Sequence, residues 1–150
     1  MLQIPVAKVA VLAATFAFDR PYTYKIPQPL TDTLCPGCRV MVPFSRGNRP
    51  CEGMVLALDK AEDDPKLKPI TRQLDPEPIL SPELIRLAVW MHDRFFCTIY
   101  DALHAILPAG VWYRVSTVYC AAPELDAAAA LAQCGRSKQR RFALETVLEH

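Results

Sequence analysis

The sequence predicts a mainly β fold with some α-helix, of the α+β class. We expect a small, partly closed β-barrel of about five or six short strands, followed by two short helices and a truncated further unit. Two observations support this expectation. Apolar and polar residues alternate with period two in short segments before residue 75, and the period becomes helical after residue 81. Hydrophobic residues make up 51% of the chain and charged residues 22%, which is typical of a packed domain.

The strands are expected in five segments, which are rich in β-branched and aromatic residues and are separated by loops of charged residues, glycine and proline. The first continues into an apolar run at 9–18, which we interpret as buried strand. Gly53 lies inside the fourth segment and indicates a bulge or a close approach of two backbones. The five segments are residues 6–16, 22–26, 39–44, 52–58 and 68–74.

Two helices are expected next. Ser81 and Pro82 form an N-cap followed by proline at the first helical position, and apolar residues then recur at helical spacing. A second helix is expected over residues 99–107, ended by Pro108 and Gly110. We therefore expect a first domain at residues 1–112.

Residues 113–150 are expected to open a second domain. They are predicted to hold a strand at 113–120 and helices at 124–133 and 138–149. About 40 residues are too few to bury a core of their own, so this unit is expected to be incomplete.

Composition and charge narrow the function. The formal net charge is only +1, so no broad basic surface is available to hold a long stretch of nucleic acid. Any DNA binding must use a small, shaped site. No pairing of nucleophile and base, and no glycine loop for phosphate, stands out, so no catalytic residue is assigned. The six cysteines do not form a secreted disulfide pattern, and no segment resembles a membrane span or signal peptide, which favours the cytoplasm.

Cys35 and Cys38 form a CPGC motif, which suggests either a zinc knuckle or a redox dithiol. A structural zinc site needs four ligands, and no second pair follows at metal spacing. A thioredoxin-like pair would stand between a strand and a helix, whereas this motif precedes a strand. An incidental turn is favoured, and a metal or redox module stays open as an alternative.

Basic and aromatic residues mark candidate binding positions. Arg39, Arg46 and Arg49 lie in an eleven-residue stretch without an acid and are candidates for phosphate contacts. Lys68 could also reach a phosphate. Aromatic residues at 22, 24 and 44 could provide a stacking platform worth about 1–3 kcal/mol per base. Each of these residues could instead be ordinary surface or core, and their spacing does not decide between the two.

Several strings occur in the order and spacing of a known protein family. The chain resembles the amino-terminal region of the PriA (primosomal protein N′) family of bacterial replication-restart helicases, well over residues 5–112 and less firmly beyond. The string at 36–44 is the most specific, and it resembles the family's xxGCRVxVPFG. The matching strings are VAKVAV at 6–11, RPYTYKIP at 20–27, PGCRVMVPF at 36–44, LKPITRQLD at 67–75, PILSPEL at 78–84 and LPAG at 107–110.

The resemblance implies an OB-like barrel, followed by the start of a winged-helix domain, that captures the 3′ end of the leading strand at a stalled fork. It implies that Tyr22 contacts the terminal base, Thr23 faces the 3′-hydroxyl, Ser45 lends backbone to the pocket wall, and Lys68 meets phosphate or base. The family often has Asp where Thr23 stands and Gly where Ser45 stands. A hydroxyl forms a weaker bond than a carboxylate and does not repel phosphate. We therefore expect 3′-end binding with weaker rejection of a 3′-phosphate.

The resemblance also implies what this segment does not carry. In the family, the ATP-dependent 3′–5′ helicase motor and the zinc-binding cysteines lie further along the chain, so no cofactor, no metal and no enzymatic activity are expected here. The implied partners are forked or single-stranded DNA with a free 3′ end and, in the full-length family, primosome proteins and single-stranded DNA-binding protein, with no membrane. A protein-interaction barrel without a nucleic-acid role is a further alternative.

Overall fold

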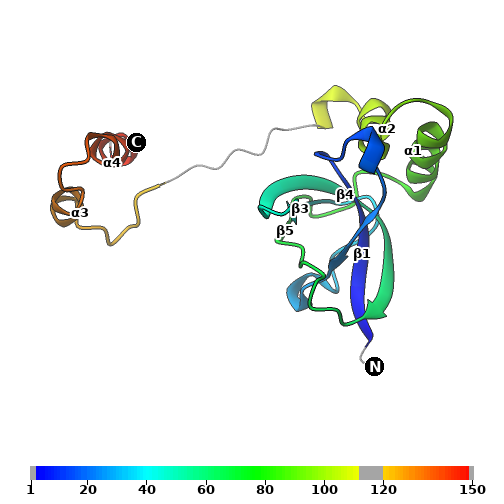
Figure 1. Ribbon diagram of the computed structural model, residues 1–150, viewed down its shortest axis with the longest axis horizontal. Helices are drawn as coiled ribbons and strands as arrows, with labels where there is room; N and C mark the ends of the chain where they lie inside the picture. The colour runs from blue at the N-terminus through cyan, green and yellow to red at the C-terminus, as the bar shows by residue number, and fades with distance from the viewer. Residues whose placement is uncertain (1–2, 112–119, 149–150) are drawn as a thin grey trace. The chain divides into compact units, whose positions relative to one another are not determined.

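The structure is a computed structural model, and it describes residues 3–111 and 120–148. The chain divides into two compact units, Met1–Trp112 and Tyr113–His150. In the first unit an antiparallel sheet precedes two α-helices along the chain, so the predicted α+β class is confirmed (Figure 1).

Five strands form one sheet in the order β2-β1-β4-β3-β5. The long strand β4 pairs with β1 on one side and with β3 on the other. Gly53 of β4 lies against β1, where an added Cβ would come within 2.5 Å of Val9 Cγ1. The predicted close approach is therefore confirmed, while the register shift of the ladder lies elsewhere, opposite Lys8 and Val9. The strands are β1 (Gln3–Val11), β2 (Tyr22–Lys25), β3 (Arg39–Phe44), β4 (Arg49–Glu62) and β5 (Arg72–Gln73).

The two edges of the sheet meet through the segment that leads into β5. Lys25 at the end of β2 donates its N–H to Lys68 O at 2.9 Å and accepts from Ile70 N at 3.0 Å. These bonds bracket Pro69, which forms an isolated parallel bridge with Lys25. Because proline has no N–H to offer, it fits the one position of this seam that needs no donor. The sheet is thereby closed into a small barrel of the OB-like kind.

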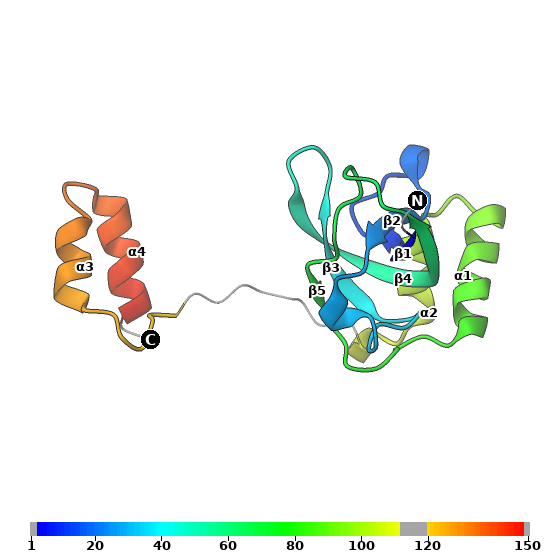
Figure 2. The same cartoon turned by 90° about the horizontal axis from the view of Figure 1, so that it is seen from below.

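Two apolar cores lie on the two faces of the sheet. The inside of the barrel is filled by buried residues such as Val9, Val40 and Ile70. On the other face, Ala10 and Met54 pack against the helices α1 (Pro82–Arg94) and α2 (Ile99–Ile106), which lie together beside the sheet (Figure 2). Ser81 caps α1 by accepting from Leu84 N, and Thr98 caps α2 in a capping box with Asp101.

The predicted bounds of three strands were wrong. The first strand ends at Val11 because its partner ladder ends there, and the apolar residues beyond it form an exposed turn and a short 3-10 helix, η1 (Phe16–Phe18). The fourth strand extends into the charged segment because residues 59–62 pair with β1, and ladder bonds are independent of side-chain polarity. The fifth strand is only the two residues Arg72–Gln73, because the preceding residues at 68–70 pair with Lys25 around Pro69 instead of with β3.

The second unit contains α3 (Ala127–Gln133) and α4 (Lys138–Leu148). Asp126 caps α3 by accepting from Ala128 N and Ala129 N. The predicted strand at 113–120 lies almost entirely outside the described residues. Within 3–111 and 120–148, no helix is both long enough and apolar enough to cross a membrane. Short 3-10 turns also occur at η2 (Gln28–Leu30) and η3 (Ala109–Val111).

Candidate nucleic-acid interface

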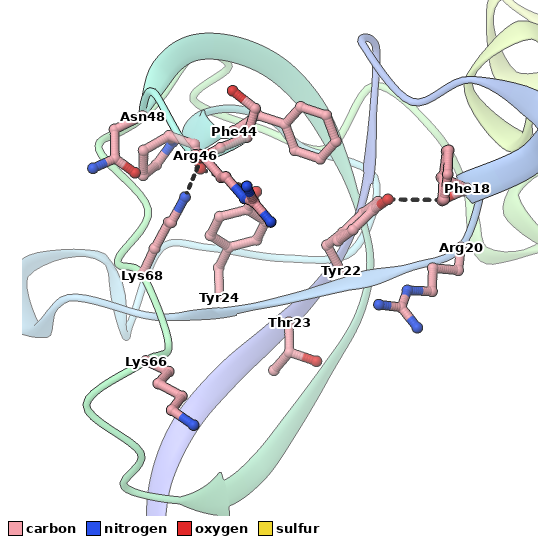
Figure 3. Close-up of a pocket in the computed structure, with 12 residues that line it drawn as sticks. Phe18, Arg20, Tyr22, Thr23, Tyr24, Phe44, Arg46, Asn48, Lys66 and Lys68 are labelled. Atoms are coloured by element: carbon pink, nitrogen blue, oxygen red, sulfur yellow. Dashed lines mark hydrogen bonds between the residues drawn. The ribbon is translucent and has the colours of Figure 1, made fainter.

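An open depression of about 980 Å³ lies where β2, the β3–β4 turn and the seam segment meet (Figure 3). Its volume is at the upper end of the roughly 300–1,000 Å³ found for small-molecule sites. Four of the positions named by the family resemblance border it, together with the candidate phosphate contact Arg46. The lining residues are Phe18, Arg20, Tyr22, Thr23, Tyr24, Pro43, Phe44, Ser45, Arg46, Asn48, Lys66 and Lys68.

Aromatic side chains form one wall of the depression. The rings of Tyr22 and Phe44 meet edge to face with centroids 5.1 Å apart, and both residues are half-buried. The Tyr22 hydroxyl donates to Phe18 O at 2.7 Å, and the Arg20 guanidinium lies 5.7 Å from the Tyr22 ring centre. Tyr22 is therefore held on both sides. Its ring is fixed in place before any ligand arrives.

Tyr24 is mainly a core residue. Its side chain is only 4% exposed, and its hydroxyl donates to Pro43 O at 3.3 Å. Burial is the main cause that raises the pKa of Tyr24 to about 12, with smaller contributions from nearby Cys51 and Tyr22. Of the two tyrosines that share this face of β2, Tyr22 is thus the one more available to a ligand.

The turn between β3 and β4 forms the upper rim. Ser45 has φ +62° and Asn48 has φ +50°, so both adopt the left-handed conformation. Asparagine tolerates this region better than serine, for which glycine would be the relaxed choice. The Lys68 ammonium donates to Ser45 O at 2.7 Å, a bond that braces the turn across the depression (Figure 3). Lys68 therefore fixes the main chain at Ser45 in addition to lining the depression.

Thr23 borders the depression but directs its side chain to the opposite side of β2 from Tyr22 and Tyr24 (Figure 3). This follows from the alternation of side chains along a strand. Its Oγ1 accepts from Lys8 Nζ at 2.8 Å, across the β1–β2 ladder. Thr23 therefore borders the depression mainly with its main chain, while its side chain is bonded to Lys8.

The depression is electropositive. Its described lining includes Arg20, Arg46, Lys66 and Lys68 and contains no carboxylate. Arg20 and Lys66 were not predicted contacts, because both occur in segments of mixed charge. Only the fold shows that four cations line one depression in a chain whose net charge is +1.

Arg39 lies in the interior, so its predicted phosphate contact was wrong. It is 0% exposed, and its guanidinium donates to both carboxylate oxygens of Asp75, at 3.0 and 2.7 Å. Its backbone N–H also donates to Asp75, and Glu52 lies 3.5 Å from the guanidinium. A buried arginine needs carboxylate partners, because an uncompensated charge inside a protein is costly. Arg49 is exposed at the start of β4 and is not among the lining residues.

The Cys35–Cys38 motif forms a tight turn. Gly37 has φ +91°, and a Cβ there would come within 2.2 Å of Leu80 O. Cys38 is buried, and burial raises the pKa of its thiol, which opposes the thiolate that redox or metal chemistry requires. No cluster of three or more potential metal ligands occurs among residues 3–111 and 120–148. The metal and redox alternative gains no support.

Comparison with known proteins identifies the family. Residues 8–108 match the family model of the PriA 3′DNA-binding domain (3′BD). The chain is also 38% identical over 107 residues to the replication restart protein PriA of Bacillus subtilis (strain 168), an alignment that covers 70% of this chain and 13% of that relative. The chain thus spans a small part of that relative's length. With the electropositive, aromatic-walled depression in place, we conclude that the chain belongs to the PriA 3′DNA-binding domain family.

Proposed function

We propose that the depression binds the 3′-terminal nucleotide of a DNA strand. The observation that carries this proposal is the convergence of a fixed aromatic wall, the exposed backbone of the β3–β4 turn and four cations on one depression, in a chain of the 3′DNA-binding domain family. Aromatic faces stack on any base, and lysine and arginine neutralise phosphates, so the combination suits a single unpaired nucleotide of any sequence.

Each part of the depression has a proposed role. Tyr22 stacks on the terminal base, with Phe44 supporting its edge. Arg46 and Lys68 meet the phosphate, while the turn at Ser45 provides backbone for the sugar. For Thr23 we propose a contact through the main chain at the terminal hydroxyl, since its side chain is bonded to Lys8.

The wider setting is proposed from the family. The whole protein would be an ATP-dependent restart helicase of the bacterial cytoplasm that acts with primosome proteins and single-stranded DNA-binding protein. The segment described here would use neither ATP nor zinc. It would bind the 3′ end at the fork and so position the rest of the helicase there. A barrel that binds only proteins is favoured by no feature of the depression.

The test compares forks whose nascent strand ends in a free, unpaired 3′ nucleotide with blunt duplex, by fluorescence anisotropy. Replacing the stacking ring by Tyr22→Leu keeps apolar volume and should weaken fork binding by about 5- to 100-fold, the loss of one stacked base. Lys68→Ala should also weaken it, whereas Lys60→Ala, which removes an exposed lysine of β4 outside the depression, should not.

Salt dependence provides an independent measurement. A site that neutralises one or two phosphates should give a slope of log K against log salt of about −1 to −2. The proposal is refuted by equal affinity for the fork and the blunt duplex, or by a slope near −5, which would indicate binding along a duplex. Circular dichroism melting of each variant distinguishes a lost contact from a lost fold.

A further inference from the structure

A second aromatic surface adjoins the depression. Phe18 is 73% exposed, Phe16 is 51% exposed and Phe96 is 97% exposed, although phenyl rings are usually buried. Large apolar groups gathered on a surface mark binding sites more often than chance exposure does. We name these three rings the aromatic ledge.

The ledge is continuous with the depression. Phe18 itself lines the depression, and Phe16 lies in the same short helix η1. In a 3-10 helix with three residues per turn, residues two apart differ by about 240°, or about 120° measured the other way, so these two rings lie on neighbouring sides of one turn. The Phe16 ring meets the Phe96 ring with centroids 5.8 Å apart and a tilt of 48°. The rings therefore lead from the rim of the depression to the connection between α1 and α2.

The short helix η1, which carries two of the three rings, is fixed rather than free to swing. The buried Asp19 carboxylate accepts from Ile99 N at the first turn of α2 and lies 3.3 Å from His92 Nδ1. On the other side, Phe18 O accepts from the Tyr22 hydroxyl at 2.7 Å. The C-terminal end of the short helix is thus tied both to the helical layer and to the aromatic wall. Such preorganisation lowers the entropic cost of binding.

We propose that the aromatic ledge is a second nucleotide subsite, which stacks the unpaired bases that precede the 3′-terminal nucleotide. This inference rests on the proposed function, because it places the terminal nucleotide in the depression. A strand leaving the depression past Phe18 meets exposed rings next. The exposed Arg20 lines the depression together with Phe18 and is available to a phosphate on that path. A protein partner would also pack against exposed rings. However, only a nucleic-acid strand explains why the rings begin at a depression that is lined by cations.

The test varies the length of the unpaired tail. Forks carrying one or four unpaired nucleotides at the nascent 3′ end are titrated against the full chain. The affinity should rise with the longer tail, and Phe96→Ala should lower the four-nucleotide affinity by about 5- to 100-fold while leaving the one-nucleotide affinity unchanged. Phe142→Ala is the matched control, since it removes a ring of α4 that is likewise largely exposed, at 73% against 97% for Phe96.

The outcomes separate this inference from the proposed function. If the wild-type affinity is the same for both tails, or if Phe96→Ala affects both equally, the ledge does not bind bases. An effect of Phe96→Ala confined to self-association in sedimentation would identify a protein-docking surface and overturn the inference. In any of these cases, weakened one-nucleotide binding by Tyr22→Leu would still support the terminal site.

Discussion

Breaking the buried ion pair between Arg39 and Asp75 should strongly destabilise the barrel. We consider Asp75→Asn, which keeps the side-chain shape and removes the charge. Asp75 accepts three hydrogen bonds from Arg39, two of them from the guanidinium, and both residues are nearly inaccessible to solvent. The substitution leaves the Arg39 charge in the interior with Glu52 as a more distant partner at 3.5 Å.

The expected loss follows from these contacts. Two charge-assisted bonds contribute roughly 3–6 kcal/mol if they are simply added. Removing one partner of a buried pair costs about 3–5 kcal/mol. Because Glu52 still compensates part of the charge, we expect the free energy of unfolding to fall by about 3 kcal/mol. This is a large share of the total stability of a domain of this size, which is about 5–15 kcal/mol. At about 4 °C per kcal/mol, the melting temperature should fall by roughly 12 °C or more.

Urea unfolding followed by circular dichroism measures this loss. The matched control is Asp63→Asn, which breaks the exposed pair between Lys25 and Asp63 and should cost less than about 1 kcal/mol. The double change Arg39→Met with Asp75→Leu should restore much of the stability, because it removes both charges together. The reasoning is refuted if Asp75→Asn costs no more than the control.

Three further predictions concern the depression and its rim. With four lining cations and no carboxylate among the described lining residues, binding should prefer a 3′-hydroxyl to a 3′-phosphate by less than about a hundredfold, or 2.7 kcal/mol; anisotropy showing more would contradict this. Ser45→Gly should raise unfolding stability by about 0.5 kcal/mol by relaxing the positive φ, and a lower melting temperature would count against it. Because the pKa of Tyr24 is raised from 10 to about 12, its contribution to the free energy of unfolding is complete below about pH 10 and is lost as the pH rises through 12; Tyr24→Phe should remove this alkaline loss of about 3 kcal/mol in urea titrations.

Local pattern was a good guide to the sheet. The alternation in residues 39–44 predicted β3 with its observed bounds, and the Ser81-Pro82 pair located the start of α1. Both signals depend on neighbours in the sequence, so they survive folding unchanged. The apolar run at 9–18 misled because hydrophobicity does not specify burial, and Phe18 is 73% exposed.

The site was less predictable because its parts come from distant segments. Arg39 and Asp75 are 36 residues apart, and only the fold turns a basic residue beside a loop into an interior charge. Arg20 and Lys66 are likewise far apart in the sequence, and only the fold brings both to the lining of one depression. Motif strings identified Tyr22 and Lys68 by resemblance, yet they gave no indication that Lys68 braces the turn at Ser45.

The seam at Lys25 and Pro69 couples the site to the integrity of the barrel. The same few residues close the sheet and present Lys68 to the depression. With DNA bound in the depression as proposed, the closed barrel is stabilised by an amount that grows with the logarithm of the ligand concentration over its dissociation constant. The amide hydrogens of Lys25 and Ile70 should therefore exchange with solvent more slowly when DNA is present. Their exchange rates then report whether the depression is occupied by DNA.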